Sequence, residues 1–184
     1  MVLGSDWNTA FEGRSSIISS TVIAAGSTVL TTTIALMAAF ALSRILYLRD
    51  TPYLNINLFQ RMLPPIAIII PLVFIFRNTG LHDTHLGLIF AHTLINLPFA
   101  LLLMKSFMDD IPTTIDDAAM IDGATRRQCF WKIHLPMMRG GVAATAILCF
   151  VFSWTEFILE VFLTNTIQTV TVKITTYSSW TYGY

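Results

Sequence analysis

An uncharged apolar run near the start of the chain, residues 17–42, constrains the fold more than any other feature. It contains no Asp, Glu, Lys or Arg and mixes aliphatic residues with Ser, Thr, Ala and Gly. About 20 such residues cross the hydrocarbon core of a bilayer as a helix, and small side chains let neighbouring helices approach closely. The run therefore predicts a membrane-spanning helix.

The composition agrees with a membrane protein. Apolar residues make up 54% of the 184 residues and charged residues only 12%, whereas a soluble domain carries about a quarter charged residues. No basic block suited to nucleic acid is present. Cys129 and Cys149 are the two cysteines, and they form no disulfide framework or paired metal-ligand motif, so we interpret both as packing residues.

Three further apolar runs follow, at residues 62–76, 86–104 and 142–163. The run 62–76 contains Pro71 among its prolines and is short, so it predicts a broken or kinked span, with a re-entrant segment as the alternative. Together the four runs predict an all-α polytopic membrane protein. Polar residues inside spans are candidates for a solute pathway, because such groups face protein or water rather than lipid; the candidates are His92, Asn96, Trp154 and Glu156.

The longest polar interval, residues 113–136, has the local signals of two short helices. Thr114 and Asp117 resemble a capping box, and Gly123 can end the helix in a left-handed conformation. Thr125 and Gln128 form a second capping box. On the second helix, helical spacing suggests one face with Cys129, Phe130 and Ile133 and another with Arg127, Trp131 and His134.

Lysine and arginine predict the orientation. If residues 105–141 are cytoplasmic, four spans put residues 43–61 on the same side, and eight of the 11 Lys and Arg side chains then lie inside. The opposite side holds Arg14, Arg77 and Lys173. This agrees with the positive-inside rule and places both ends of the chain outside. Because residues 1–16 do not resemble a signal peptide, we expect the chain to be a fragment with at least one span missing upstream.

The polar interval resembles a known motif. Asp117, Ala118 and Ala119, then Gly123, Ile133, Leu135 and Pro136, have the spacing of the EAA motif in permease subunits of ATP-binding-cassette (ABC) importers of the type I fold. The one departure is Asp117, where the family usually has Glu. The residues around Asp122 and around Trp154 look closest to importers of sugars and polyols of the maltose type.

The resemblance implies one type-1 permease domain over residues 1–184, incomplete at both ends, with four of six spans present. It implies a multi-pass protein of a bacterial or archaeal plasma membrane that imports a sugar or sugar alcohol. Residues 105–141 would form the coupling loop that docks on the ATPase, with Arg126, Arg127 and Trp131 supplying further contacts. The implied partners are ABC ATPase subunits, a second permease subunit identical or different, an external solute-binding protein and the lipid bilayer. No catalysis or cofactor is expected in this chain, since ATP and Mg²⁺ would bind the ATPase.

Other interpretations remain open. The chain lacks a phosphate-binding loop of the ATPase type. His82, Asp83 and His85 suggest a metal site only weakly, because no further ligand follows at a known spacing, and the acidic residues of 109–122 are explained by caps and solvated faces. For function, the alternatives are an importer of the same fold for an amino acid or an ion, and a truncated membrane protein that no longer transports.

Overall fold

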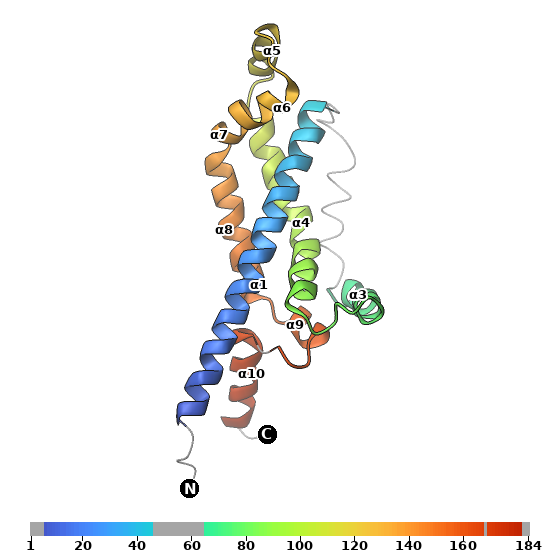
Figure 1. The fold of residues 1–184 in the computed structure, drawn as a ribbon, viewed down its shortest axis with the longest axis vertical. Coiled ribbons are helices and arrows are strands. Elements are labelled where there is room, and N and C mark those ends of the chain that lie inside the picture. The colour runs from blue at the N-terminus through green and yellow to red at the C-terminus, as the bar shows by residue number, and fades with distance from the viewer. Residues whose placement is uncertain (1–5, 46–64, 168, 182–184) are drawn as a thin grey trace. The chain divides into compact units, whose positions relative to one another are not determined.

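The computed structural model describes residues 6–45, 65–167 and 169–181, with side chains described for 14–45, 67–167 and 169–175. Within these ranges every regular element is a helix (Figure 1). The elements are α1 (Asp6–Phe40), η1 (Ala41–Ile45), α3 (Pro65–Thr79), α4 (His85–Asp109), α5 (Thr114–Ile121), α6 (Arg126–Gln128), η2 (Cys129–His134), α7 (Leu135–Met137), α8 (Arg139–Thr155), α9 (Ile158–Leu163) and α10 (Val170–Thr181). The two η elements are π-helices, whose wider turn is rare and is often found at functional sites.

Two helices are long and apolar enough to cross a bilayer, over Arg14–Ile45 and His85–Asp109. These contain the predicted runs 17–42 and 86–104. A third candidate counts Arg126–Met137 together with Arg139–Thr155, although the two parts are bent by 72°. The described part of the run 62–76 lies in α3, a short helix with Pro71 inside it; residues 62–64 lie outside the described residues. These spans in the bilayer remain predictions.

The last predicted run, 142–163, is not one continuous helix. α8 ends at Thr155 and α9 begins at Ile158. The Glu156 carboxylate, one residue before the N-cap Phe157, accepts a hydrogen bond of 3.1 Å from the backbone nitrogen of Ile158, so it satisfies the first free N–H group of the new helix. The apolar run therefore contains a helix break that hydropathy does not register.

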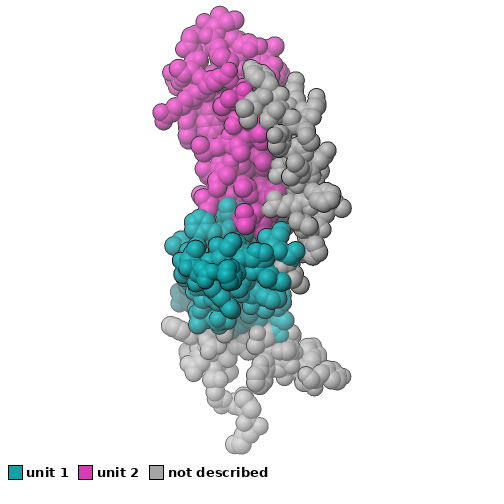
Figure 2. Space-filling model, turned by 90° about the vertical axis from the view of Figure 1, so that its right-hand side faces the viewer, with its two compact units in different colours: residues 1–28, 63–93, 150–184 teal, residues 29–62, 94–149 magenta. Residues whose placement is uncertain are grey.

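The described chain divides into two compact units, coloured separately in Figure 2. Unit 1 comprises Met1–Thr28, Leu63–Thr93 and Phe150–Tyr184, and unit 2 comprises Val29–Met62 and Leu94–Cys149. In unit 1, α3 packs against α9. Ser27, His92 and Ser153 form a buried hydrogen-bonded chain between three helices, with Ser153 Oγ 2.9 Å from Ser27 Oγ and 2.7 Å from His92 Nδ1.

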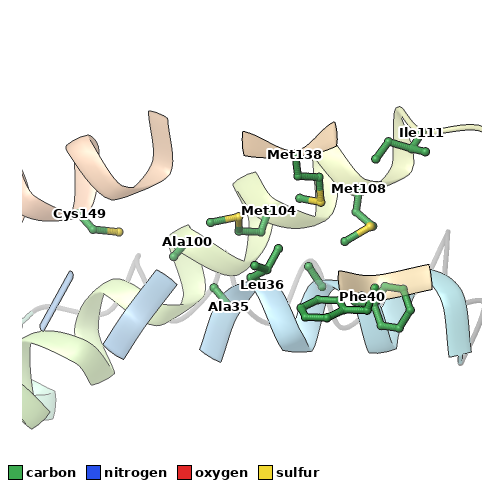
Figure 3. Packing of buried hydrophobic residues seen from close by; sticks show 11 residues of the cluster. Ala35, Leu36, Phe40, Ala100, Met104, Met108, Ile111, Met138 and Cys149 are labelled. Atoms are coloured by element: carbon green, nitrogen blue, oxygen red, sulfur yellow. The ribbon is translucent and has the colours of Figure 1, made fainter. Parts of the chain in front are cut away.

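Unit 2 has its core between the second half of α1, the second half of α4 and the segments that follow (Figure 3). α1 contributes residues at a spacing of four, including Leu36 and Phe40, and α4 does the same with Ala100, Met104 and Met108. Such spacing places side chains on one face of a helix. The short helices α5, α6 and α7 lie together beyond these ends of α1 and α4 (Figure 1). The core of unit 2 therefore provides the platform on which the polar interval is mounted.

Candidate functional site

The first short helix, α5, begins and ends as local chemistry requires, with one exception. At its end Gly123 has φ +83°, its nitrogen donates to the carbonyl of Met120 at 3.1 Å, and the nitrogen of Ala124 donates to the carbonyl of Ala119 at 2.9 Å. This pair of bonds is a Schellman motif, and it confirms Gly123 as the helix terminator. At the start, Thr113 is the N-cap and makes no side-chain cap. The predicted box of Thr114 with Asp117 was wrong because Thr114 is already inside the helix.

The second capping box is confirmed. Thr125 is the N-cap of α6, its hydroxyl accepts a hydrogen bond of 3.3 Å from the nitrogen of Gln128, and the Gln128 side chain accepts one of 2.8 Å from the nitrogen of Thr125. The chain continues through η2 into α7, where Pro136 stands in the first turn. The sequence therefore folds locally into two short helical segments joined by a tight turn at Gly123.

Most of the motif side chains lie on the surface of unit 2. The exposed ones are Asp117, Ala118, Gly123, Arg126, Arg127, Trp131 and Pro136, and the half-buried ones are Ala119, Ile133 and Leu135. All lie on the continuous segment from α5 to α7. We call this set of ten residues the α5–α7 surface. It offers two guanidinium groups, an indole with 56% of its area exposed and several small side chains, which is the chemistry of a protein-binding surface.

The residues that hold this surface in place are different ones, and the sequence alone did not identify them. Asp116, not Asp117, is the buried carboxylate of α5. Its Oδ2 lies 3.0 Å from Nε of Arg44 and its Oδ1 lies 2.6 Å from Nε2 of His134. Since a carboxylate only accepts, His134 is placed to donate through Nε2. His134 is completely buried, so its predicted position on a face with Arg127 and Trp131 was wrong.

Arg44 comes from η1, at the end of α1, and its guanidinium also reaches the end of α4. Its Nη2 donates to the carbonyl of Met108 at 2.9 Å and to the carbonyl of Ile111 at 2.5 Å. The backbone carbonyl of Arg44 accepts a hydrogen bond of 2.8 Å from Nη1 of Arg126. Around this polar group, Phe40 packs edge to face on Phe130 and on His134, with ring centroids 5.1 and 5.2 Å apart.

One sequence signal pointed toward Asp116. Ile115 and Ala119, spaced by four residues, mark the inner face of α5, and Asp116 is adjacent to that face. A carboxylate there must find a cation, because an unpaired buried charge is very costly. That cation is Arg44, which is far away in the sequence, so the spacing within α5 could not identify it.

The candidates for a solute pathway have different environments. His92 is buried and engaged with Ser153, and Asn96 is buried as well. Trp154 stacks on Phe150 with ring centroids 5.7 Å apart, and these two rings line a mostly apolar pocket of about 360 Å³ together with Thr21, Val151 and Thr155. Glu156 is half-buried and accepts the hydrogen bond from Ile158 at the start of α9. Their role in transport remains a prediction.

Glu160 lies in the predicted run 142–163 and is only 3% exposed. Its side chain is buried in unit 1 and accepts hydrogen bonds from the hydroxyls of Thr169 and Thr171. Among the described residues, no group of three His, Cys, Asp or Glu side chains is arranged to hold a metal ion. Of the loop residues considered for a metal, Asp83 instead binds the loop before α10 through Asn165 and Thr166.

Comparison with known proteins identifies the family. Residues 31–183 match the model of the binding-protein-dependent transport system inner membrane component. The chain belongs to this family. It is a membrane component of transport systems and not an enzyme, and its apolar helices agree with a multi-pass protein of the bacterial plasma membrane.

Several curated relatives are similar along most of this chain. The trehalose transport system permease protein SugB of Mycobacterium tuberculosis is 34% identical over 160 residues, covering 87% of this chain and 58% of the relative. The sulfoquinovosyl glycerol transport system permease protein SmoH of Agrobacterium fabrum is 34% identical over 143 residues, covering 78% and 50%. The chain thus spans about half the length of these relatives.

A solved structure has the same fold. It is a bacterial ABC transporter involved in the import of the acidic polysaccharide alginate, matched with a TM-score of 0.72 and 21% identity over 90% of this chain and 57% of that chain. At this identity the likeness concerns the fold alone. It confirms the predicted all-α permease fold, and the family match confirms the resemblance carried by the EAA-like spacing.

Proposed function

We propose that this chain is the permease part of an ATP-driven, binding-protein-dependent importer, and that the α5–α7 surface is where it docks on the ATPase. The observation that carries the proposal is the combination of motif spacing and exposure. The residues at motif positions are held by a Schellman turn and a capping box while their side chains remain available to a partner. Local hydrogen bonds thus leave the surface preorganised for docking.

The proposed solute is a sugar or a sugar alcohol. The relatives carry names that refer to trehalose, sulfoquinovosyl glycerol and diacetylchitobiose. A pathway for such solutes needs aromatic faces for stacking and polar groups for the hydroxyls. The pocket at Trp154 and Phe150, with Thr21 and Thr155 on its lining, offers both, and His92, Asn96 and Glu156 are further candidates. A same-fold importer of an amino acid or an ion, or a truncated protein without transport, is the alternative.

The proposed assembly follows from the proposed function. ATPase subunits would bind ATP and Mg²⁺, and this chain would bind no cofactor of its own. A second permease subunit, identical or different, and an external solute-binding protein would complete the importer in the bilayer. In this arrangement the contribution of the chain is mechanical, since ATP-driven closure of the ATPase would displace the α5–α7 surface.

Docking can be tested by alanine substitution at Trp131 and Arg127, purified from native membranes in mild detergent. We expect each variant to lose most of the ATPase subunit that co-purifies with the wild type, because exposed Trp and Arg are the residue types that dominate protein interfaces. Asp110→Ala is the matched control, since Asp110 is exposed just before α5 and lies outside the surface. Full retention of the ATPase by both variants would show that the partner docks elsewhere.

The solute path has its own test. Trp154→Phe preserves an aromatic face and Trp154→Ala removes it, so sugar uptake should need a higher sugar concentration in the alanine variant and change little in the phenylalanine variant. Uptake of amino acids or ions in place of every sugar tested would favour the alternative importer.

A further inference from the structure

The two short helices of the α5–α7 surface have almost no buried side chains of their own. Asp116 is the single buried residue among the eight of α5, and α6 has none. Helices usually attach to their domain by an apolar face. α5 attaches in this way only through Ile115, which is partly buried and packs against the core of unit 2, and α6 has no buried side chain. Polar contacts therefore carry much of the positioning of both helices on unit 2.

Those contacts converge on one residue. Arg44 binds α5 through the ion pair with Asp116, and it binds α6 through its backbone carbonyl, which accepts from Arg126. The same guanidinium donates to the carbonyls of Met108 and Ile111 at the end of α4. Because Arg44 is itself part of the π-helix that follows α1, this one residue connects α1 with α4 and α5 through its side chain and with α6 through its backbone carbonyl.

The burial and the geometry of this contact restrict how the joined segments can move. Arg44 is 4% exposed and Asp116 7% exposed, so solvent screens their attraction little. The contact of Arg44 with Asp116 is an ion pair of 3.0 Å, and the same planar guanidinium is oriented by its hydrogen bonds to the carbonyls of Met108 and Ile111. His134 adds a bond from the second segment to the same carboxylate. The polar network thus adds directional contacts to the apolar packing of Ile115.

We propose that Arg44 and Asp116, with His134, form a buried polar joint that positions the α5–α7 surface and transmits its displacement to the ends of α1 and α4. The inference rests on the proposed docking function and deepens it. Arg44 is thus a positioning residue of coupling although it lies outside the motif and outside the docking surface.

Three variants of the full protein, assembled with its ATPase, test the joint. Asp116→Asn removes the charge, Asp116→Glu restores it, and Asp122→Asn is the matched control, because Asp122 is exposed at the C-cap of the same helix. We expect Asp116→Asn to retain the ATPase subunit but to reduce solute molecules imported per ATP hydrolysed by about tenfold. Asp116→Glu should recover most of that ratio, and Asp122→Asn should not change it.

A second measurement works on the permease chain alone. Cys129 is buried and lines the same small pocket as Arg44 and Asp116. If the joint fixes α5 and η2, a thiol reagent should modify Cys129 about tenfold faster in Asp116→Asn than in the wild type or Asp122→Asn. The rate of Cys129 modification can be measured without the ATPase.

A variant that leaves the buried Arg44 without its carboxylate partner could fail to fold, so a double variant is included. Arg44→Met with Asp116→Leu removes both charges, and replacing a whole buried pair by apolar residues is often tolerated. We expect it to fold and to retain the ATPase while import per ATP falls.

The outcomes separate the two proposals. An unchanged ratio of import to ATP hydrolysis in both Asp116→Asn and the double variant, with Cys129 still protected in Asp116→Asn, would overturn the joint while leaving docking intact. If the wild-type chain retained no ATPase, the proposed function would fail and the coupling role of the joint with it, whereas rapid modification of Cys129 in Asp116→Asn would still support its positioning of α5.

Discussion

Oδ2 of Asp83 accepts a hydrogen bond of 2.7 Å from the hydroxyl of Thr166, and Oδ1 accepts two of 3.0 Å from the backbone nitrogens of Asn165 and Thr166. Asp83 itself has φ +58°, a left-handed conformation that Asp and Asn tolerate better than most residues. The backbone nitrogen of Asp83 in turn donates to the carbonyl of Leu163. Within unit 1, this single residue therefore binds the loop between α3 and α4 to the loop before α10.

The pH dependence of this loop contact can be predicted. Slight burial raises the pKa of the Asp83 carboxyl, but the hydrogen bonds from Thr166 and Asn165 outweigh it and hold the pKa below its ordinary value of 3.8. A lowered pKa means that the contact stabilises the fold fully above pH 3.8 and is lost as the pH falls through the lowered value. Hydrogen-exchange protection of Asn165 and Thr166 should therefore persist from pH 7 to about pH 4 and decline below it. Asp83→Asn tolerates the same φ without the charge and should show weaker protection at all of these pH values; a decline already at pH 6 would contradict the assignment.

Substitution of Gly123 should damage the turn between α5 and α6. Its φ of +83° costs a branched residue about 1–2 kcal/mol, whereas no atom would clash with an added Cβ. Gly123→Val should therefore expose the α5–α6 turn to limited proteolysis and reduce solute uptake, and Gly123→Asn should do so much less. Equal effects of Val and Asn would show that side-chain size, not backbone conformation, matters there.

Gly141 should be sensitive for a different reason. A Cβ there would lie 2.6 Å from Cδ2 of Phe107, whereas a Cβ on Gly140 meets nothing within 4 Å. Gly141→Ala should lower the stability of unit 2 by about 1–3 kcal/mol through overpacking. Thermal unfolding in detergent should show a lower midpoint for Gly141→Ala and an unchanged or higher midpoint for Gly140→Ala. If both variants melted alike, the close approach of α8 to Phe107 would be wrong.

The membrane orientation can be tested by thiol labelling. Cys129 and Cys149 are both buried, so the native thiols are poor reporters, whereas Lys132 in η2 is exposed. We expect an impermeant reagent to modify Lys132→Cys in inside-out vesicles and to leave it unmodified in right-side-out vesicles. The protein without the Lys132→Cys substitution gives the background level of labelling. Labelling of the new cysteine from outside would reverse the orientation predicted from the positive charges.

Local rules explain the parts of this protein that could be predicted from its sequence. The uncharged run 17–42 had to be helical in a bilayer, because every backbone group must be satisfied within the segment. Gly123 and the pair Thr125 and Gln128 act within one turn of their own helices, so their roles could be read from spacing alone. The resemblance to the family could also be found in the sequence, because the EAA-like motif depends only on the spacing of residues within one short segment.

The tertiary structure decided what depends on residues that meet from distant parts of the chain. Asp116 and Asp117 are chemically identical neighbours, and the buried one, Asp116, is paired with Arg44 from the end of α1. His134 is buried against the same carboxylate, and the helix breaks after Thr155 within a run that hydropathy reads as continuous. The sequence by itself determined the long apolar helices and the turn and cap of the polar interval, because these depend on hydropathy and on local spacing. The fold decided which charges are buried together, because the energy of a buried charge depends on its neighbours in space.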